Sequence, residues 1–303
     1  MQATAIAREL ATQGYSIVRG FLSDTDISPA FIAHLESANK FFDGVINDIP
    51  GPEMASIQKK IGALIPDVAR ELGITISPGL YGYSAIRIQH AEGPPALRKP
   101  FNVHQDPKIA PGGVLNWHLD HFSYYLHRDH TNWLICYMPV VKSSRKLANL
   151  AIVPKNVVEA LDPELQERIQ GRGAMRFRCV EEDTVEWFKL RFPEQAIQIG
   201  DWFVIDDFED STMGWKINFD LEQHKVVPEL DEKDLLIMRA DIIHRTNDAG
   251  IDRISIRCDA LPVQAAKLST RLGLLNLTLR YPFMGAKRRY NLKKWLKQAW
   301  RRA

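Results

Sequence analysis

The feature of the sequence that most restricts the fold is a change of hydrophobic pattern near Leu80. Before it, apolar residues such as Met54, Ile57 and Ile61 recur at the spacing of one helix face. After it, the chain divides into short β-rich segments separated by turns, with one further helix expected over 156–170. The predicted strands are 83–89, 133–141, 150–153, 196–205, 235–244 and 253–261. Short strands that do not alternate regularly with helices favour an antiparallel barrel or sandwich over a doubly wound parallel sheet.

The same pattern divides the chain into three parts. Residues 1–80 are expected to form a helical cover with an N-terminal strand within 14–23, which runs into a helix capped by Ser23 or Asp24. Residues 81–262 are expected to form the β core, and residues 263–303 a basic C-terminal tail. The sequence has no internal repeat and no low-complexity linker, so we expect one mainly β core with helical additions.

Composition excludes several classes of protein. A chain of 303 residues with 45% hydrophobic residues can bury a large core, which argues against disorder. No apolar run approaches the roughly 18 to 20 residues that a membrane-spanning helix needs. The N-terminus lacks the features of a signal peptide, so a cytoplasmic location is expected. Three cysteines, far apart in sequence, argue against a disulfide framework or a structural zinc site.

Three His-x-Asp tripeptides provide candidate metal ligands: His104 with Asp106, His118 with Asp120, and His127 with Asp129. A histidine and a carboxylate on one strand edge, joined by a second histidine from a distant strand, form the facial triad that binds non-haem iron(II) and leaves three coordination positions open. The tripeptide occurs easily by chance, so by itself it does not choose among the three.

His244 is the best candidate for the distant histidine, because it ends an apolar strand and precedes a turn at 247–250. After the turn, strand alternation places Arg253, Ser255 and Arg257 on one face. A guanidinium and a hydroxyl on one face can together bind a carboxylate. We expect Arg253 to return alongside His244 on the neighbouring strand, which suits a ligand that chelates metal at one end and carries a carboxylate at the other.

These motifs resemble the iron(II)- and 2-oxoglutarate-dependent dioxygenases, particularly the phytanoyl-CoA-hydroxylase-like branch, from Gly14 to about Leu261. The similar segments are Gly-Tyr-x-x-x-Arg-Gly-Phe-Leu-Ser at 14–23, Trp-His-x-Asp at 117–120, and the closing His, Asn and Arg-x-Ser at 244–255, and they occur in the family's order. The sequence departs from the pattern at 154–156, where a Pro-Gly-Ser-His turn is usual, and no glycine follows Asn149.

The resemblance implies a double-stranded β-helix core of the jelly-roll, cupin-like type. In the family, the conserved Asn lies roughly thirty residues after the first ligand. His118 lies 31 residues before Asn149, whereas His104 lies 45 and His127 lies 22 residues before it. The resemblance therefore favours His118 and Asp120 over the other two pairs.

The roles that the resemblance implies are as follows. The iron ligands and catalytic centre are His118, Asp120 and His244. Arg253 and Ser255 bind 2-oxoglutarate, and Thr246 hydrogen-bonds it. Two further candidates come from position and not from the resemblance. His121, close to Asp120 in sequence, is either a hydrogen-bonded or solvent-exposed histidine or lines the substrate pocket. Arg257 is either a charged residue on an exposed strand face or reaches an acidic group of the substrate or of 2-oxoglutarate.

The resemblance further implies Fe(II) as cofactor, with 2-oxoglutarate and O2 as cosubstrates. In related halogenases a Gly or Ala stands in the position of Asp120. An intact carboxylate therefore favours hydroxylation or desaturation of an unactivated C–H bond.

The C-terminal segment is basic and amphipathic. Residues 260–303 hold eleven Lys or Arg and no Asp or Glu. Within Asn291 to Ala303, Trp and Leu side chains share one helical face and cations occupy the rest, which is typical of a helix lying on an anionic membrane surface. A helix packed on the domain, an oligomer interface and, less favoured, nucleic-acid binding are the alternatives. The membrane interpretation predicts peripheral attachment at the inner membrane face and an anionic, small or lipid-linked substrate, such as the lipopolysaccharide sugar Kdo.

Two other functions compete with an oxygenase. One is a non-catalytic 2-oxoglutarate sensor, and the other is a cupin-like metalloenzyme that uses the same ligands without 2-oxoglutarate. The acidic run from Asp206 to Asp210 is predicted to be a solvated loop and not a second metal site.

Overall fold

A computed structural model describes residues 2–37, 45–47, 51–76, 82–88, 116–121, 123–124, 128–208, 214–247 and 253–260. The alternative ligands His104, Asp106 and His127 and the C-terminal tail lie outside these residues. Asp129 is described, and its Oδ1 accepts a hydrogen bond from the backbone N–H of Thr131.

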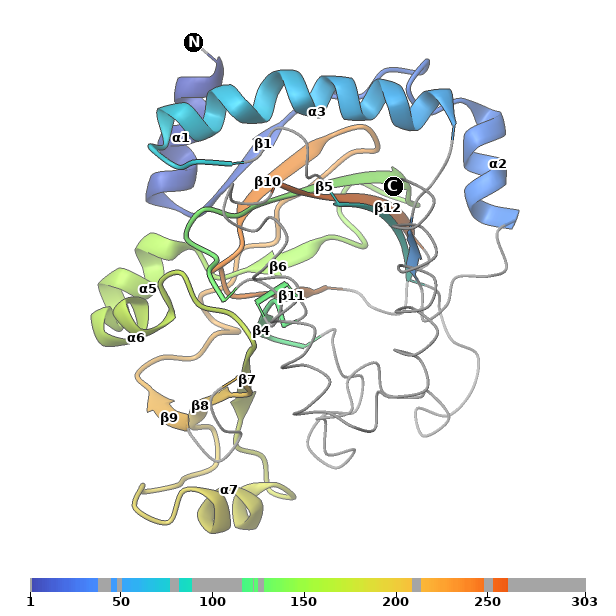
Figure 1. Cartoon of the computed structure of the whole chain (residues 1–303). Helices are drawn as coiled ribbons and strands as arrows, with labels where there is room; N and C mark the ends of the chain where they lie inside the picture. Colours follow the sequence, from blue (N-terminus) through green and yellow to red (C-terminus); the bar gives the residue numbers. More distant parts are fainter. Residues whose placement is uncertain are drawn as a thin grey trace, which may run out of the picture.

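The described strands form two six-stranded sheets in which every pairing is antiparallel (Figure 1). In spatial order, the first sheet contains β1 (Tyr15–Val18), β10 (Leu235–Arg239), β5 (Leu134–Val141), β12 (Arg253–Ala260), β3 (Gly82–Ile88) and β2 (Val45–Asn47). The second contains β6 (Leu150–Ile152), β11 (His244–Thr246), β4 (His118–Leu119), β7 (Met175–Cys179), β8 (Trp202–Asp206) and β9 (Gly214–Ile217).

The chain crosses repeatedly from one sheet to the other. It passes from β3 to β4, β5 and β6 in alternate sheets, and it does so again from β10 through β11 to β12. This crossing is the winding of a double-stranded β-helix. The predicted mainly β, jelly-roll fold is confirmed.

Strand alternation gives the first sheet two different faces. On β5, Cys136 and Met138 face outward into a core that contains Leu10 of helix α1 (Gln2–Thr12) and Ile61 of helix α3 (Pro52–Glu71). Figure 1 shows α3 lying across this sheet. The alternate residues, such as Tyr137, face the interior and pack with residues from both sheets. The N-terminal helices therefore cover the outside, and the interior face remains for the site.

The second sheet is covered on its outer face by α5 (Lys155–Leu161) and α6 (Pro163–Ile169), whose apolar side chains pack with Trp117, Leu119 and Phe177. A third short helix here, α7 (Val185–Arg191), contributes Phe188 to an aromatic cluster at the far end of β7 and β8.

Four boundaries differ from the sequence prediction. The predicted strand 196–205 is a strand only from Trp202 onward, in β8. The predicted helix over 156–170 is two helices, because Pro163 lacks a backbone N–H and Asp162 leaves helical geometry to accept a hydrogen bond from Leu165. The helix expected at Ser23 or Asp24 begins instead at Pro29, in α2 (Pro29–Ser37). The buried carboxylate of Asp26 binds the backbone N–H and hydroxyl of Ser23, which holds a turn there.

The fourth difference concerns His244. The predicted strand 235–244 ends at Arg239, and after a turn His244 begins the separate strand β11 in the other sheet. Strands of two or three residues are too short for a periodic pattern to reveal. By contrast, Met175–Cys179 has the alternation of a strand, with Arg176 and Arg178 between apolar residues, and the prediction missed this signal.

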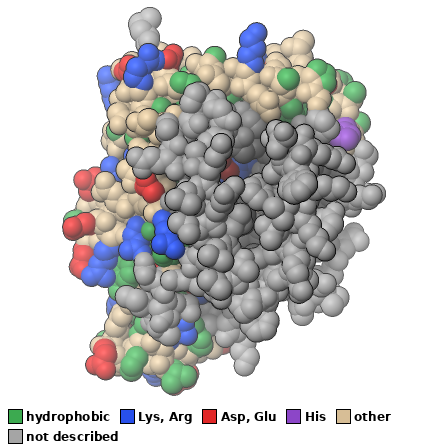
Figure 2. Space-filling model, viewed as in Figure 1, with side chains coloured by type: hydrophobic (Ala, Val, Ile, Leu, Met, Phe, Trp, Pro, Cys, Tyr) green, Lys and Arg blue, Asp and Glu red, His purple; other side chains and the backbone are tan. Residues whose placement is uncertain are grey.

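The described residues include no helix that is both long and apolar enough to cross a membrane. On the face shown in Figure 2, acidic and basic side chains of the described residues are interspersed. The basic excess of the sequence falls on residues 260–303, nearly all outside the described part.

Gly173 provides a test of how tightly the chain packs beside Asp120. A Cβ at Gly173 would lie 2.7 Å from the backbone oxygen of Asp120 and 2.4 Å from the ring of His130. We expect Gly173→Ala to lower the free energy of unfolding by about 1–3 kcal/mol through overpacking. Gly62 of α3 is the matched control, because a Cβ there meets nothing within 4 Å. Gly62→Ala should raise stability by about 0.4–1 kcal/mol. Urea unfolding measures both, and equal effects would contradict the packing.

Candidate metal centre

The centre is built on one cross-strand pair, His118 of β4 and His244 of β11, which lie directly opposite each other. Their ring centroids are 4.5 Å apart. Asp120 follows β4, and its Oδ1 lies 3.6 Å from His118 Nε2 and 3.8 Å from His244 Nε2. One ligand atom from each of the three residues lies within 4.8 Å of the others. The structure therefore brings together the three residues that the sequence predicts as iron ligands.

Both histidines are oriented by their own backbone. His118 Nδ1 lies 2.5 Å from the carbonyl oxygen of Asn116, and His244 Nδ1 lies 2.9 Å from that of Ile242. A carbonyl oxygen only accepts, so each Nδ1 carries the proton and donates. In the neutral imidazole, this tautomer leaves Nε2 as the nitrogen with a free lone pair, which is the form that binds metal.

Asp120 is fixed through its second oxygen. Arg257 Nη2 donates to Asp120 Oδ2 at 2.7 Å, and Arg257 Nε donates to Asp259 Oδ1 at 2.9 Å. Burial alone would raise the pKa of Asp120, but Arg257 and the two histidines hold it well below its usual range. The acidic groups that Arg257 reaches here belong to the protein itself, and its contact with substrate stays a prediction.

The environment also keeps His244 neutral. Burial, followed by the proximity of His118, lowers the pKa of His244 to about 4. A neutral imidazole and an ionised carboxylate are the states that metal binding requires. Two neutral histidine nitrogens with one carboxylate form a donor set that fits a non-haem iron(II) ion.

Arg253 and Ser255, the residues predicted to bind a carboxylate, face the same interior as the triad, but they belong to the first sheet and the two triad histidines to the second. Arg253 of β12 donates from Nη1 to the carbonyl of Asn149 at 3.0 Å and from Nη2 to Thr246 Oγ1 at 3.2 Å. Ser255 donates to Tyr137 Oη at 2.6 Å. Arg253 therefore does not lie on a strand paired with His244, as expected from the sequence, but meets the end of β11 from across the interior.

Arg253 is almost fully buried, at 2% exposed, yet both of its hydrogen-bond acceptors are neutral. Within the described residues, no carboxylate lies at ion-pair distance from it. Lys142 adds a second cation: its Nζ donates to Asn149 Oδ1 and to the carbonyl of Leu230, each at 2.6 Å. Burial and the nearby Arg253 lower the pKa of Lys142 to about 8. This corner has an excess of positive charge suited to a carboxylate ligand. No sequence pattern pointed to Lys142 or Tyr137.

His121 belongs to a buried charge network beside the triad. Its Nε2 lies 2.9 Å from Asp207 Oδ2, and Arg176 binds the same carboxylate through Nε at 2.5 Å and Nη2 at 2.7 Å. Arg176, opposing the effect of burial, lowers the pKa of Asp207 to about 2. Asp206 and Asp207 are 4% and 5% exposed, so the prediction of a solvated loop is wrong for both. His121 as a substrate contact stays a prediction.

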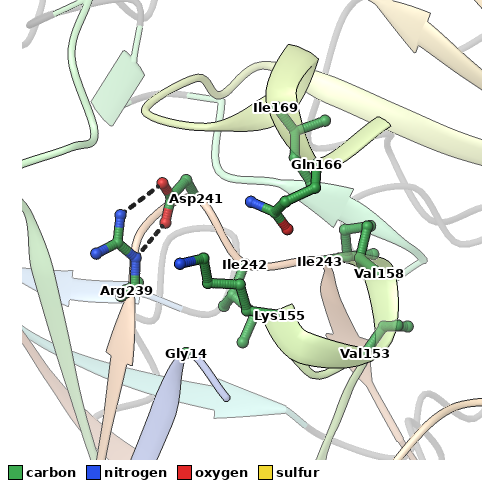
Figure 3. Close-up of a pocket in the computed structure, with 10 residues that line it drawn as sticks. All are labelled: Gly14, Val153, Lys155, Val158, Gln166, Ile169, Arg239, Asp241, Ile242 and Ile243. Carbon is green, nitrogen blue, oxygen red and sulfur yellow. Dashed lines mark hydrogen bonds and ion pairs between the residues drawn. The ribbon is translucent and has the colours of Figure 1, made fainter. Parts of the chain in front are cut away.

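A separate pocket lies behind the turn that leads into His244 (Figure 3). Its volume is about 10 Å³, enough for one water molecule. Arg239 and Asp241 form a two-bond ion pair at its edge, and Asp241 also accepts the backbone N–H of Gly171. The pocket is too small for a substrate, and these bonds fix the turn that positions His244.

No protein-family model matches the chain, and no curated protein sequence matches it. Solved structures do match. EctD from S. alaskensis, with 2-oxoglutarate and 5-hydroxyectoine, is 12% identical with a TM-score of 0.44 over 86% of this chain and 76% of that one. The epimerase SnoN, in complex with Fe3+, alpha ketoglutarate and nogalamycin RO, is 12% identical with a TM-score of 0.45 over 86% and 84%. A Pseudomonas putida prolyl-4-hydroxylase is 10% identical with a TM-score of 0.43 over 86% and 94%.

Two of these structures hold 2-oxoglutarate, and one of them also holds iron. None of these structures singles out the phytanoyl-CoA-hydroxylase-like branch, which stays a prediction.

Arg257 is expected to position Asp120 for the metal. Arg257→Lys keeps the charge but loses the fork that holds Asp120 and Asp259 together. Because residues that orient metal ligands typically contribute about 10- to 100-fold to metal affinity, we expect Fe(II) affinity to fall by about tenfold. Arg245→Lys is the control, since Arg245 neighbours His244 but pairs with Glu222. Anaerobic Fe(II) titration measures both, and equal affinities would show that Arg257 does not position the ligand.

His130 predicts a dependence of stability on pH. Its Nδ1 donates to the carbonyl of Arg172, its Nε2 accepts from Ser123, and burial lowers its pKa to about 4 from 6.5. The unfolded chain therefore binds a proton below about pH 6.5 that the folded chain does not take up until about pH 4. Stability should fall as pH decreases through this window, by up to about 1.4 kcal/mol per pH unit for this histidine.

Urea unfolding of the iron-free protein between about pH 7.5 and pH 4.5 measures this loss. The His130→Gln variant should show a shallower decline than the wild type. Gly62→Ala, which changes no titratable group, should keep the wild-type slope. An unchanged slope in His130→Gln would contradict the assignment.

Proposed function

We propose that the protein is an Fe(II)- and 2-oxoglutarate-dependent oxygenase. The observation that carries the proposal is the combination of two oriented histidines and one fixed carboxylate with a buried arginine that lacks a carboxylate partner among the described residues. A triad alone suits many metalloenzymes. A cationic corner facing the same interior is what a chelating dicarboxylate requires.

Each residue has a role in this proposal. His118, His244 and Asp120 hold the iron, and Arg257 keeps Asp120 Oδ1 directed at the two Nε2 atoms. Arg253 binds the distal carboxylate of 2-oxoglutarate with charge-assisted hydrogen bonds, and the hydroxyls of Thr246 and Ser255 lie beside it. When bound, iron activates O2 so that 2-oxoglutarate is oxidised to succinate and CO2 while a substrate C–H becomes C–OH.

Buried apolar and aromatic side chains pack in the interior between the two sheets. The core shared by the two sheets contains Tyr137 and Ile135 from β5 and Ile152 from β6, which pairs with His244. A dry, low-dielectric interior strengthens the ion pairs that hold the cosubstrate.

We further propose hydroxylation as the outcome, because Asp120 occupies the third protein ligand position. For the substrate, we propose an anionic small or lipid-linked molecule, Kdo-like sugars being one class. The basic segment from Asn291 to Ala303 supports an anionic partner, including an anionic membrane surface.

The proposal is tested by mixing the protein anaerobically with Fe(II) and 2-oxoglutarate and recording the weak visible charge-transfer band of the chelate. Arg253→Ala should raise the 2-oxoglutarate concentration needed for the band about 10- to 100-fold, because it removes charged hydrogen bonds worth about 1.5–3 kcal/mol. The Asp120→Ala variant should lose tight iron binding.

Arg70→Ala is the control, because Arg70 is an exposed residue of α3 that pairs with Asp67. Well-folded, iron-loaded protein without a band would favour the cupin-like metalloenzyme. A band without succinate formation in O2 would favour the sensor.

A further inference from the structure

Three arginines are almost fully buried in the described residues: Arg176 at 6%, Arg178 at 4% and Arg253 at 2% exposed. A buried guanidinium is costly unless an anion or several acceptors surround it. Arg176 is bound by both oxygens of Asp207, and Arg253 has two neutral acceptors and a proposed ligand. Arg178 stands apart from both.

Two nitrogens of Arg178, Nε and Nη1, are buried without a hydrogen-bond partner. No carboxylate of the described residues lies at ion-pair distance from it. Arg176 acts on it as a like charge. The carboxylates of Asp207 and Glu181 attract it only from beyond ion-pair distance, and Asp207 already binds Arg176 and His121. Burial, followed by Arg176, lowers the pKa of Arg178 to about 10, which leaves it protonated at neutral pH.

The register of β7 places Arg178 relative to the triad. Met175 and Phe177 face the outer core with α5 and α6, so Arg176 and Arg178 face inward. Arg176 pairs directly with His118 across the sheet. Arg178 lies two residues farther along the same face, which is about 6.6 Å by strand geometry. One small molecule could therefore reach from Arg178 to the metal ligands.

We propose that Arg178 binds an acidic group of the substrate, a carboxylate or a phosphate, and thereby sets which carbon lies at the iron. This rests on the proposed oxygenase function and assigns the anionic end of its substrate. The planar guanidinium offers two parallel donors to either anion. An unpaired buried charge lowers stability. A ligand whose acidic group pairs with the Arg178 guanidinium explains why an arginine is kept on this face.

The test uses inorganic phosphate and acetate as probes, with neutral acetamide as the matched control, at constant ionic strength. The protein is held anaerobically with saturating Fe(II) and 2-oxoglutarate, so that Arg253 is occupied and the chelate band reports the proposed function in the same sample. The rise in thermal midpoint with probe concentration gives an apparent affinity. Phosphate or acetate, whichever binds more tightly, identifies the anion class.

We expect at least one anion, but not acetamide, to stabilise the wild type. Arg178→Met should weaken that binding about 10- to 100-fold, the loss typical of charged hydrogen bonds. Without probe, its thermal midpoint should equal or exceed that of the wild type, which a purely structural arginine would not allow. Arg178→Lys, which keeps the charge, should retain part of the binding. Arg70→Met, at an exposed arginine of α3, should bind as the wild type does.

The outcomes separate the two proposals. If the band forms but neither anion stabilises the wild type more than acetamide, or if Arg178→Met binds anions equally well, the Arg178 proposal is overturned and the oxygenase proposal stands. If no band forms, the oxygenase proposal fails, and the anion titration of the iron-free protein still decides whether Arg178 binds an acid. Should Arg178→Met fail to fold, the wild-type and Arg178→Lys titrations decide.

Discussion

The site depends on one backbone pairing, between the two-residue strand β4 and the three-residue strand β11. It sets His118 and His244 face to face, and each ring is then held by the carbonyl two residues before it in its own chain. These local bonds fix the tautomer and the direction of both rings before any metal arrives. The neighbouring strands β6 and β7 pair on either side, so the short strands are held at the centre of a sheet and not at its edge.

Charge is distributed in this interior by pairing. Asp120 is paired with Arg257, and Asp207 with Arg176 and His121. Each ion pair compensates a buried charge and also orients a side chain. In Asp120, Oδ2 accepts the hydrogen bond from Arg257, which leaves Oδ1 facing the two histidines. Removing Arg257 would therefore affect both the ionisation and the direction of the carboxylate.

The sequence predicted the parts of the site that follow from periodicity. Strand alternation placed Arg253, Ser255 and Arg257 on one face, and the structure agrees. The motif spacing identified His118, Asp120 and His244, which the fold brings together. The crossing between sheets was not predictable, because the turn between β10 and β11 contains Ala240, Ile242 and Ile243, so the mostly apolar segment from Leu235 to His244 has the pattern of a single strand. The partner of Arg257 could not be predicted either, because Asp120 lies 137 residues away in the sequence.

The buried charges also suggest an order of binding. Without ligands, the acids Asp120 and Asp259 are offset by Arg257 and Arg253, and Lys142 adds a positive charge beside Arg253. Iron(II) alone would add two further positive charges in a low-dielectric interior, and dianionic 2-oxoglutarate would cancel them. Iron and 2-oxoglutarate should therefore strengthen each other's binding, a coupling that must be reciprocal. Since Asp207 offsets Arg176, positive charge would still remain on Lys142 and Arg178. A substrate with an acidic group would reduce this remaining charge, so the charge of the interior itself favours an anion as the last ligand to enter.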